Sequence, residues 1–151
     1  SSTGYPLGEH LLVSNQPACL YSESIHVPWL VYDSQREATT YRHQDLIGSD
    51  ELTARFIKGL PIHCDNSRMD SLIRISGNND DFALRSKAWH FVNRDNQHEL
   101  YAKPDDRWEV NEIANRCVDV VEMFQELATT QTSNNENQIE LPKRLTSTWN
   151  R

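Results

Sequence analysis

Apolar residues recur at every third or fourth position along residues 117–130. This spacing places them on one face of an α-helix, which completes a turn in about 3.6 residues. The stripe consists of Cys117, Val120, Val121, Phe124, Leu127 and Ala128. The segment is therefore predicted to form an amphipathic helix that packs this stripe against the rest of the protein.

The preceding residues alternate between short apolar runs and clusters of turn-forming residues. The runs are SLIRIS (71–76), FALRSKAWHFV (82–92) and HELYAK (98–103), and the turns are GNNDD (77–81) and NRDNQ (93–97). Runs of this length between such turns are typical of β-strands joined by tight connections. We expect an antiparallel meander of three or four strands, depending on whether the second run bends at Ser86 and Lys87. The 117–130 helix is expected to cover it.

The first part of the chain is less regular. Residues 1–19 contain several Gly and Pro residues and are predicted as a loop. Leu20 to Ile25 can form a short helical turn, which Pro28 stops. The run Trp29-Leu30-Val31-Tyr32 has no polar alternation, so it is predicted as a strand covered on both faces.

A second helix is predicted from Ser49 to about Leu60. Ser49 is its expected N-cap, and Leu52, Phe56 and Leu60 recur at a spacing of four residues. At the other end of the chain, residues 131–151 begin with a polar stretch, which favours a flexible tail. The residues from Leu141 to Arg151 are not expected to pack.

Composition excludes some classes of protein. The 151 residues are 37% hydrophobic, enough for a core, and carry a net charge of −7. An acidic chain is a poor ligand for nucleic acid. No apolar run approaches the roughly 20 residues of a membrane-spanning helix. The three cysteines lie far apart without a Cys-x-x-Cys pair, so we interpret them as buried thiols.

Candidate chemistry is sparse when the residues are taken alone. No two of the six histidines have the i, i+4 spacing of a helical metal site, and neither a Gly-x-Ser-x-Gly nor a phosphate-binding Gly-x-x-x-x-Gly-Lys sequence occurs. The most ligand-like cluster is His-Cys-Asp at 63–65, for which a chance grouping in a loop is the simpler interpretation. His90, inside a predicted strand, is expected to be partly buried and hydrogen-bonded. The pairs Asp80-Asp81 and Asp105-Asp106 fall in predicted turns.

Two stretches nevertheless resemble the sulfatase family. STGYPLGEH (2–10), followed by LYSESIHVPWLV (20–31), is similar to the family segment Ser-Asp-His/Asn-Gly-x-x-Leu-Gly-x-His and its Tyr-Glu-x-x-x-x-Val-Pro strand. Residues 82–116 resemble the C-terminal signature of the family. The matching residues there are Ala83, Arg85, Trp89, Glu99, Leu100, Tyr101, Asp105 or Asp106, Glu109, Asn111 or Asn115, and Ala114. Order and spacing agree over roughly residues 1–130.

This resemblance implies a fold between α/β and α+β, namely the C-terminal piece of an alkaline-phosphatase-like fold. Residues 1–60 would end the α/β core, residues 61–130 would form the C-terminal antiparallel sheet with its helix, and residues 131–151 would be the tail. An intact relative hydrolyses sulfate esters with a formylglycine nucleophile and Ca²⁺ or another divalent cation. The nucleophile motif Cys/Ser-x-Pro/Ala-x-Arg does not occur in this chain, and neither does the Asp-Asp metal pair that the family has in its N-terminal part.

The implied partners are a missing N-terminal sulfatase core and a sulfated small molecule or polysaccharide, with no cofactor bound by this chain itself. The implied compartment is periplasmic or extracellular. Ser2 and Thr3 stand at the positions of family metal ligands, and Asn15 stands near the sulfate-contacting Lys. Neutral hydroxyls are weak ligands for a divalent cation, which prefers anionic oxygens. His10 is the best surviving match to a catalytic residue, with a loop histidine bonded to backbone as the alternative.

Three hypotheses follow from the sequence. The chain is the C-terminal segment of a sulfatase-like hydrolase and is not competent alone, or it is a degenerate pseudo-sulfatase that binds an anion or a partner. The third hypothesis is a free-standing interaction module built on the sheet and the 117–130 helix.

Overall fold

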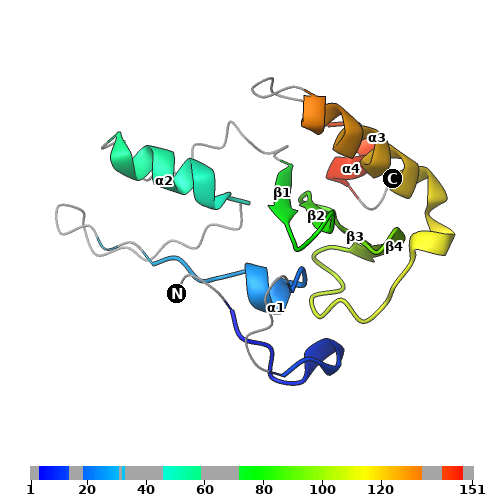
Figure 1. Ribbon diagram of the computed structural model, residues 1–151, viewed down its shortest axis with the longest axis horizontal. Coiled ribbons are helices and arrows are strands. Elements are labelled where there is room, and N and C mark those ends of the chain that lie inside the picture. The colour runs from blue at the N-terminus through cyan, green and yellow to red at the C-terminus, as the bar shows by residue number, and fades with distance from the viewer. Residues whose placement is uncertain are drawn as a thin grey trace.

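The computed structural model describes residues 4–13, 19–30, 32, 46–58, 72–133 and 141–147. Within this part of the chain, a small antiparallel sheet lies between helices on one face and an N-terminal segment on the other (Figure 1). The fold therefore belongs to the mixed α+β class.

The sheet has four strands in the order β1-β2-β3-β4, and each strand pairs antiparallel with the next. The strands are β1 (Ile73–Ser76), β2 (Phe82–Arg85), β3 (Trp89–Arg94) and β4 (Gln97–Ala102). The predicted meander is confirmed, and the second apolar run does divide at the bend around Ser86.

The connection between β3 and β4 explains the tight pairing of these strands. Asp95 and Asn96 form a two-residue turn, and both have a positive φ, 49° and 60°. Such turns suit the twist of a hairpin, and Asp and Asn tolerate the left-handed conformation better than most residues. The turn residues of the sequence therefore fix the register of the hairpin.

The two faces of the sheet bury different partners because side chains alternate along each strand. Leu84, Phe91 and Leu100 belong to the main core cluster, on the face covered by α3 (Val118–Ser133). On the opposite face, Ala83 and Val92 pack with Leu20 from the N-terminal part of the chain. The sheet is thus the middle of three layers.

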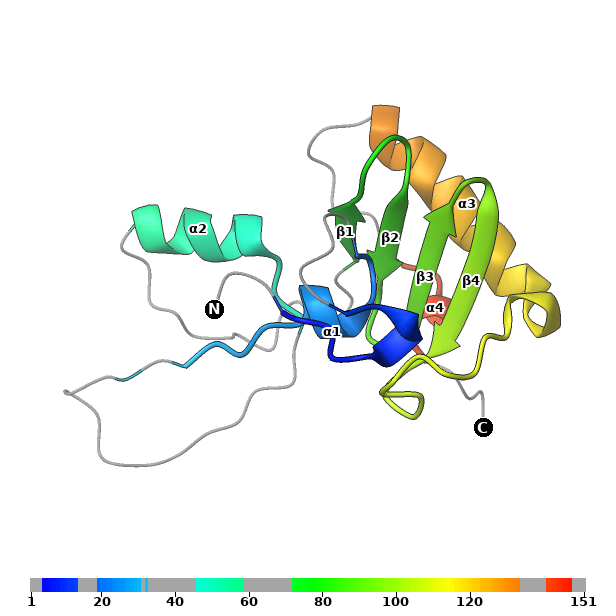
Figure 2. The same ribbon diagram turned by 60° about the horizontal axis from the view of Figure 1, so that its bottom comes forward.

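The helix α3 lies along the sheet as expected (Figure 2). Four residues of its predicted stripe are buried in the main cluster: Val120, Val121, Phe124 and Ala128. The ring of Phe124 stacks on that of Phe91, with 5.3 Å between centroids. The prediction of an amphipathic helix packed on the meander is confirmed. Between β4 and α3 lies a short 3₁₀ turn, η3 (Ala114–Arg116).

A short helix near the end of the chain, α4 (Lys143–Thr146), completes the main core. Leu145 is fully buried and Leu141 is 6% exposed, both in the cluster of α3 and the sheet. The expectation that the residues from Leu141 onward do not pack is therefore wrong for 141–147. These two leucines, four residues apart, bury apolar area in the core. The polar stretch before them gives no indication of this burial.

Polar contacts fix α4 to the bend between β2 and β3. The Ser86 hydroxyl donates to the carbonyl of Leu145 at 2.7 Å and accepts from the backbone N–H of Trp89 at 3.1 Å. The indole N–H of Trp89 donates to the carbonyl of Arg144 at 2.9 Å.

Replacing Ser86 with alanine is expected to lower the free energy of unfolding by about 1–3 kcal/mol, because it leaves buried backbone groups without their partner. Urea denaturation followed by circular dichroism measures this change. Thr53→Ala is the control, since the exposed Thr53 hydroxyl donates only to Ser49 within its own helix. Equal effects of the two substitutions would contradict the role given to Ser86.

The N-terminal segment contains the 3₁₀ turn η1 (Glu9–Leu11) and the helical turn α1 (Ser22–Ile25). The helical turn expected between Leu20 and Ile25 is confirmed. The strand expected at 29–32 is wrong for the described residues: Trp29, Leu30 and Tyr32 lie outside any strand and are 40%, 92% and 90% exposed. No described strand pairs with Trp29, Leu30 or Tyr32.

The remaining helix, α2 (Ser49–Ile57), stands apart from the sheet (Figures 1 and 2). Its N-cap is Gly48 and not Ser49, and no side chain caps it. Ser49 is the first helical residue, which corrects the sequence prediction. Phe56 and Ile57 are 77% and 78% exposed, and Leu60 lies outside the described residues.

Candidate functional site

The register of the sheet places three polar residues in one row on the face opposite α3. Arg85 of β2 pairs with His90 of β3, which pairs with Tyr101 of β4. His90 is fully buried, and its Nε2 donates to the carbonyl of Leu20 at 2.9 Å. The sequence prediction of a hydrogen-bonded His90 is confirmed. The bond also fixes residues 19–25 over this row.

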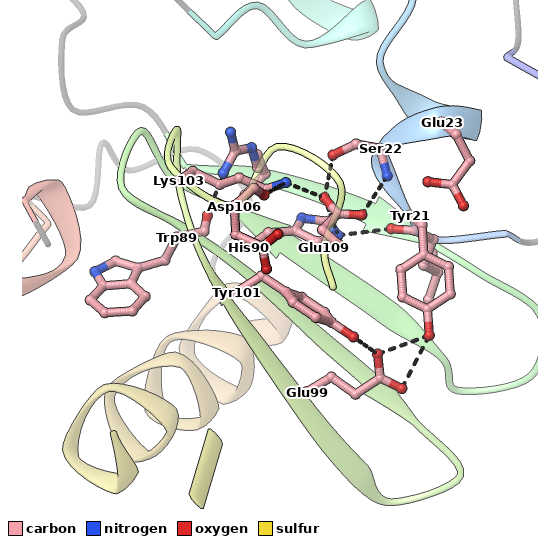
Figure 3. Close-up of polar contacts among 12 residues, drawn as sticks. Tyr21, Ser22, Glu23, Trp89, His90, Glu99, Tyr101, Lys103, Asp106 and Glu109 are labelled. Carbon is pink, nitrogen blue, oxygen red and sulfur yellow. Dashed lines mark hydrogen bonds and ion pairs between the residues drawn. The ribbon is translucent and has the colours of Figure 1, made fainter. Parts of the chain in front are cut away.

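A buried carboxylate lies against the row. Glu109 comes from the loop after β4, with a left-handed backbone (φ 55°) and a side chain without exposed surface. One oxygen lies 2.7 Å from Nζ of Lys103, and the other accepts the backbone N–H of Ser22 at 2.9 Å. The Ser22 hydroxyl donates to Glu109 as well, and Figure 3 shows how these groups converge. We call Ser22, Arg85, His90, Lys103 and Glu109 the Glu109 cluster.

The ammonium group of Lys103 uses all of its donors inside the protein. Besides Glu109, it donates to the carbonyl of Asp106 at 2.7 Å and to that of Arg107 at 3.2 Å. An ammonium has three N–H donors, so all three are accounted for. The carboxylate of Asp106 accepts the backbone N–H groups of Val110 and Asn111. These bonds shape the 103–111 loop so that Glu109 turns inward.

Burial and charge together set the protonation states of the Glu109 cluster. Burial lowers the pKa of His90 to about 4, so the ring is neutral at neutral pH. Burial alone raises the pKa of Glu109, but its hydrogen bonds with Lys103 and with the donors of Ser22 contribute to lowering it below its usual range. Burial lowers the pKa of Lys103, which Glu109 partly offsets. At neutral pH the cluster therefore contains an ionised Glu109 between cationic side chains.

The guanidinium of Arg85 adds a second cation to the cluster. Burial lowers its pKa to about 10, and Glu109 opposes this change. It donates to the carbonyl of Trp89 at 3.1 Å. Since a buried charge is costly unless it is paired, the ionised Glu109 stabilises both Arg85 and Lys103.

His10, the predicted catalytic residue, touches the same loop. Its Nε2 lies 2.9 Å from the carbonyl oxygen of Glu109, and its Nδ1 lies 2.8 Å from a carboxylate oxygen of Glu23. The ring stacks face to face on Tyr21, with 3.8 Å between centroids. Both nitrogens are thus engaged inside the protein. The catalytic assignment of His10 stays a prediction, and in this conformation the ring joins two segments of the chain.

A second polar cluster lies beside the first. The hydroxyls of Tyr21 and Tyr101 both donate to one carboxylate oxygen of Glu99, at 2.9 and 2.7 Å. Burial and the Glu99 carboxylate raise the pKa of Tyr21 to about 12, and the same two causes raise that of Tyr101. Both phenols therefore remain protonated donors, and the bond from Tyr21 to Glu99 joins the N-terminal segment to β4.

Some of the other predicted sites lie within the described residues, and the rest lie outside them. Asp81 accepts the backbone N–H of Asp95 in the hairpin turns, as expected for a turn residue. The thiol of Cys19 is buried and that of Cys117 is partly buried. The family metal positions Ser2 and Thr3, together with Asn15 and the 63–65 cluster, lie outside the described residues.

The described residues offer no group of side chains that fits the divalent cation implied by the resemblance. Within the described ranges, no three His, Cys, Asp or Glu side chains are grouped as metal ligands. The two hydroxyls at the family positions are neutral, whereas such cations prefer anionic oxygens. The buried, charge-assisted hydrogen bonds of the described residues join the stretch around Ser22 to the loop around Glu109.

Sequence reasoning missed Lys103 and Ser22 entirely. Lys103 ends an alternating strand, where a lysine is expected in solvent, and Ser22 resembles any residue of a helical turn. Glu109 appeared only as one matching residue of the C-terminal signature.

Comparison with protein-family models, with curated proteins and with solved structures gave no match. In the part of the chain that the structure describes, no helix has both the length and the apolar character needed to cross a membrane.

Proposed function

We propose that this chain is the C-terminal segment of a sulfatase-like hydrolase of the alkaline phosphatase superfamily, acting on sulfate esters of small molecules or polysaccharides. One observation carries the proposal. The described parts of the two stretches that resemble the family, within residues 2–31 and 82–116, lie against each other. Of the contacting residues, Tyr21, Glu99 and Glu109 match the family, and Ser22 stands where the family segment has Glu. Glu109 binds Ser22, and Glu99 binds Tyr21.

This contact matters because the two stretches are far apart in sequence. Ser22 and Glu109 are 87 positions apart, and Tyr21 and Glu99 are 78 apart. If each stretch resembled the family only by chance, there would be no reason to expect the two to be in contact in the folded protein. Buried polar groups tolerate few substitutions, because each one left unpaired is costly. Contacts of this kind therefore favour common descent of both stretches with the sulfatase family.

In this proposal the chain shapes the substrate pocket and the reactive groups come from elsewhere. The nucleophile motif and the N-terminal Asp-Asp metal pair of the family are not in the sequence. An N-terminal sulfatase core would supply them, with formylglycine and Ca²⁺, in a periplasmic or extracellular protein. The exposed side chains of Trp29, Leu30 and Tyr32 favour this arrangement, because large apolar groups gathered in one short run are typical of a surface that a partner covers.

The test compares this chain with the product of its gene extended upstream to an intact Cys/Ser-x-Pro/Ala-x-Arg motif. Both are incubated with 4-nitrophenyl sulfate and Ca²⁺, and nitrophenol release is followed by absorbance. The extended protein is expected to hydrolyse the ester, and this chain alone is expected to stay at the background rate. The matched control is the extended protein with alanine at the nucleophile. Hydrolysis by the chain alone would overturn the proposal.

A degenerate pseudo-sulfatase that binds an anion or a partner is the second candidate. The hydroxyls of Ser2 and Thr3 at the metal positions favour it, and so does the engagement of both ring nitrogens of His10 within the protein. The upstream coding sequence separates the two candidates. Loss of the nucleophile motif and of the Asp-Asp pair there would favour the binding protein.

A further inference from the structure

The two partners of His10 are both hydrogen-bond acceptors. The Glu109 carbonyl faces Nε2 and the Glu23 carboxylate faces Nδ1, at 2.9 and 2.8 Å. A neutral imidazole carries one N–H and can donate to only one of them, whereas an imidazolium donates to both. With Glu23 ionised, both acceptors are satisfied only when the ring is protonated.

The surroundings of the ring also favour the positive charge. Glu23 on α1, Glu9 on η1 and Glu109 on the 103–111 loop are the carboxylates around it. The stacked face of Tyr21 stabilises a cation, and Arg94, 5.3 Å from the centre of the same Tyr21 ring, is the opposing cation. Burial lowers the pKa of His10, but the acceptors of Glu109 and Glu23 outweigh it and raise the pKa above its usual value.

The segment that His10 anchors has a disfavoured backbone. Gly8 has a φ of 130°, and the next non-glycine residues with positive φ are His10 at 51° and Leu11 at 59°. Two consecutive left-handed residues persist only when other contacts hold them. Leu11 is 98% exposed, so its own side chain provides no such contact. The hydrogen bonds of His10 therefore restrain this turn together with its own bonds, from the Leu12 N–H to the Glu9 carbonyl and from the Leu7 N–H to the Glu9 carboxylate.

We propose that His10 is a proton-operated latch that ties the 4–13 segment to α1 and to the 103–111 loop at the same time. When the ring loses its proton, one of the two bonds is lost and the strained turn is released from one partner. The sign follows from the raised pKa: the latch is fully closed below the value of an unfolded histidine, about 6.5, and opens as the pH rises through the higher folded value. The inference does not depend on the proposed function.

The first experiment is a pH titration of the ¹⁵N-labelled chain, observing the ring nitrogens of the histidines. The His10 signals are identified by their loss in His10→Gln. Both His10 nitrogens are expected to remain protonated to a higher pH than in the same chain unfolded in urea. A His10 titration at or below the unfolded value would overturn the proposal, as would a neutral ring with a protonated Glu23 at neutral pH.

The second experiment measures amide hydrogen exchange of Gly4, whose N–H donates to the carbonyl of Ser24 at 2.8 Å, as a report on the segment. Its protection, relative to the Lys103 amide bonded to the Ala88 carbonyl just beyond the ends of β3 and β4, is expected to fall as His10 loses its proton. Glu23→Gln should move this fall to lower pH, and the control His26→Gln should not move it. If the protection of the Gly4 amide did not change over the pH range in which His10 titrates, the latch would be refuted.

Discussion

Replacing Glu109 with alanine is expected to lower the free energy of unfolding by about 3–5 kcal/mol, the usual cost of leaving one partner of a buried ion pair uncompensated. Lys103 is only 3% exposed and cannot regain water without moving the loop. Both donors of Ser22 lose their acceptor as well. Because domains of this size have a total stability of about 5–15 kcal/mol, the variant should show a large fall in the urea midpoint.

A second variant separates the loss of the ion pair from the loss of packing. In Lys103→Met with Glu109→Leu, apolar side chains replace both charges, and such exchanges often cost little. The double variant is expected to be more stable than Glu109→Ala, though not fully restored, since Ser22 still lacks its acceptor. The control is Asp119→Ala, which breaks the solvent-exposed contact with Arg144. A double variant no more stable than Glu109→Ala would contradict the ion-pair explanation.

Phe124→Ala is expected to cost a similar amount, about 3–5 kcal/mol, for a different reason. Phe124 is fully buried between α3 and the sheet and stacks on Phe91. Its truncation removes apolar contact and leaves a cavity that the neighbouring strands cannot fill. Thermal and urea unfolding should both report the loss.

Two further substitutions in the same helix give the scale for this effect. Phe124→Leu keeps most of the buried volume and is expected to cost less than half as much as Phe124→Ala. Glu126→Ala changes an exposed position of α3 and is expected to stay within about 0.5 kcal/mol of the original protein. If Phe124→Ala resembled Glu126→Ala, the packing of α3 on the sheet would be wrong.

The sheet and α3 could be predicted because their signals are local. Alternating apolar residues between turn clusters define β1 to β4, and the three-four spacing of Val120, Val121 and Phe124 defines the buried face of α3. Two other apolar groups had no such signal. The run at Trp29 could form a strand only beside a partner strand. Leu145 is buried because the sheet and α3 together form the apolar surface on which it packs.

The Glu109 cluster could not be predicted for the same physical reason. Its members come from α1, β2, β3 and the loop after β4, and only the strand register brings Arg85 and His90 beneath Glu109. Charged residues in a loop are solvated by default, so composition gives no indication that Lys103 and Glu109 are buried. The resemblance to a family drew attention to Glu109 without indicating what it binds.

The burial of Leu145 has a consequence for the synthesis of this protein. Leu145 lies in the same cluster as Leu84, Phe91 and Phe124, so the core stays open on one side until residue 145 has left the ribosome. Strands β1 to β4 emerge well before that point. Nascent chains therefore expose an incomplete apolar face during translation, the stage at which chaperone binding prevents aggregation.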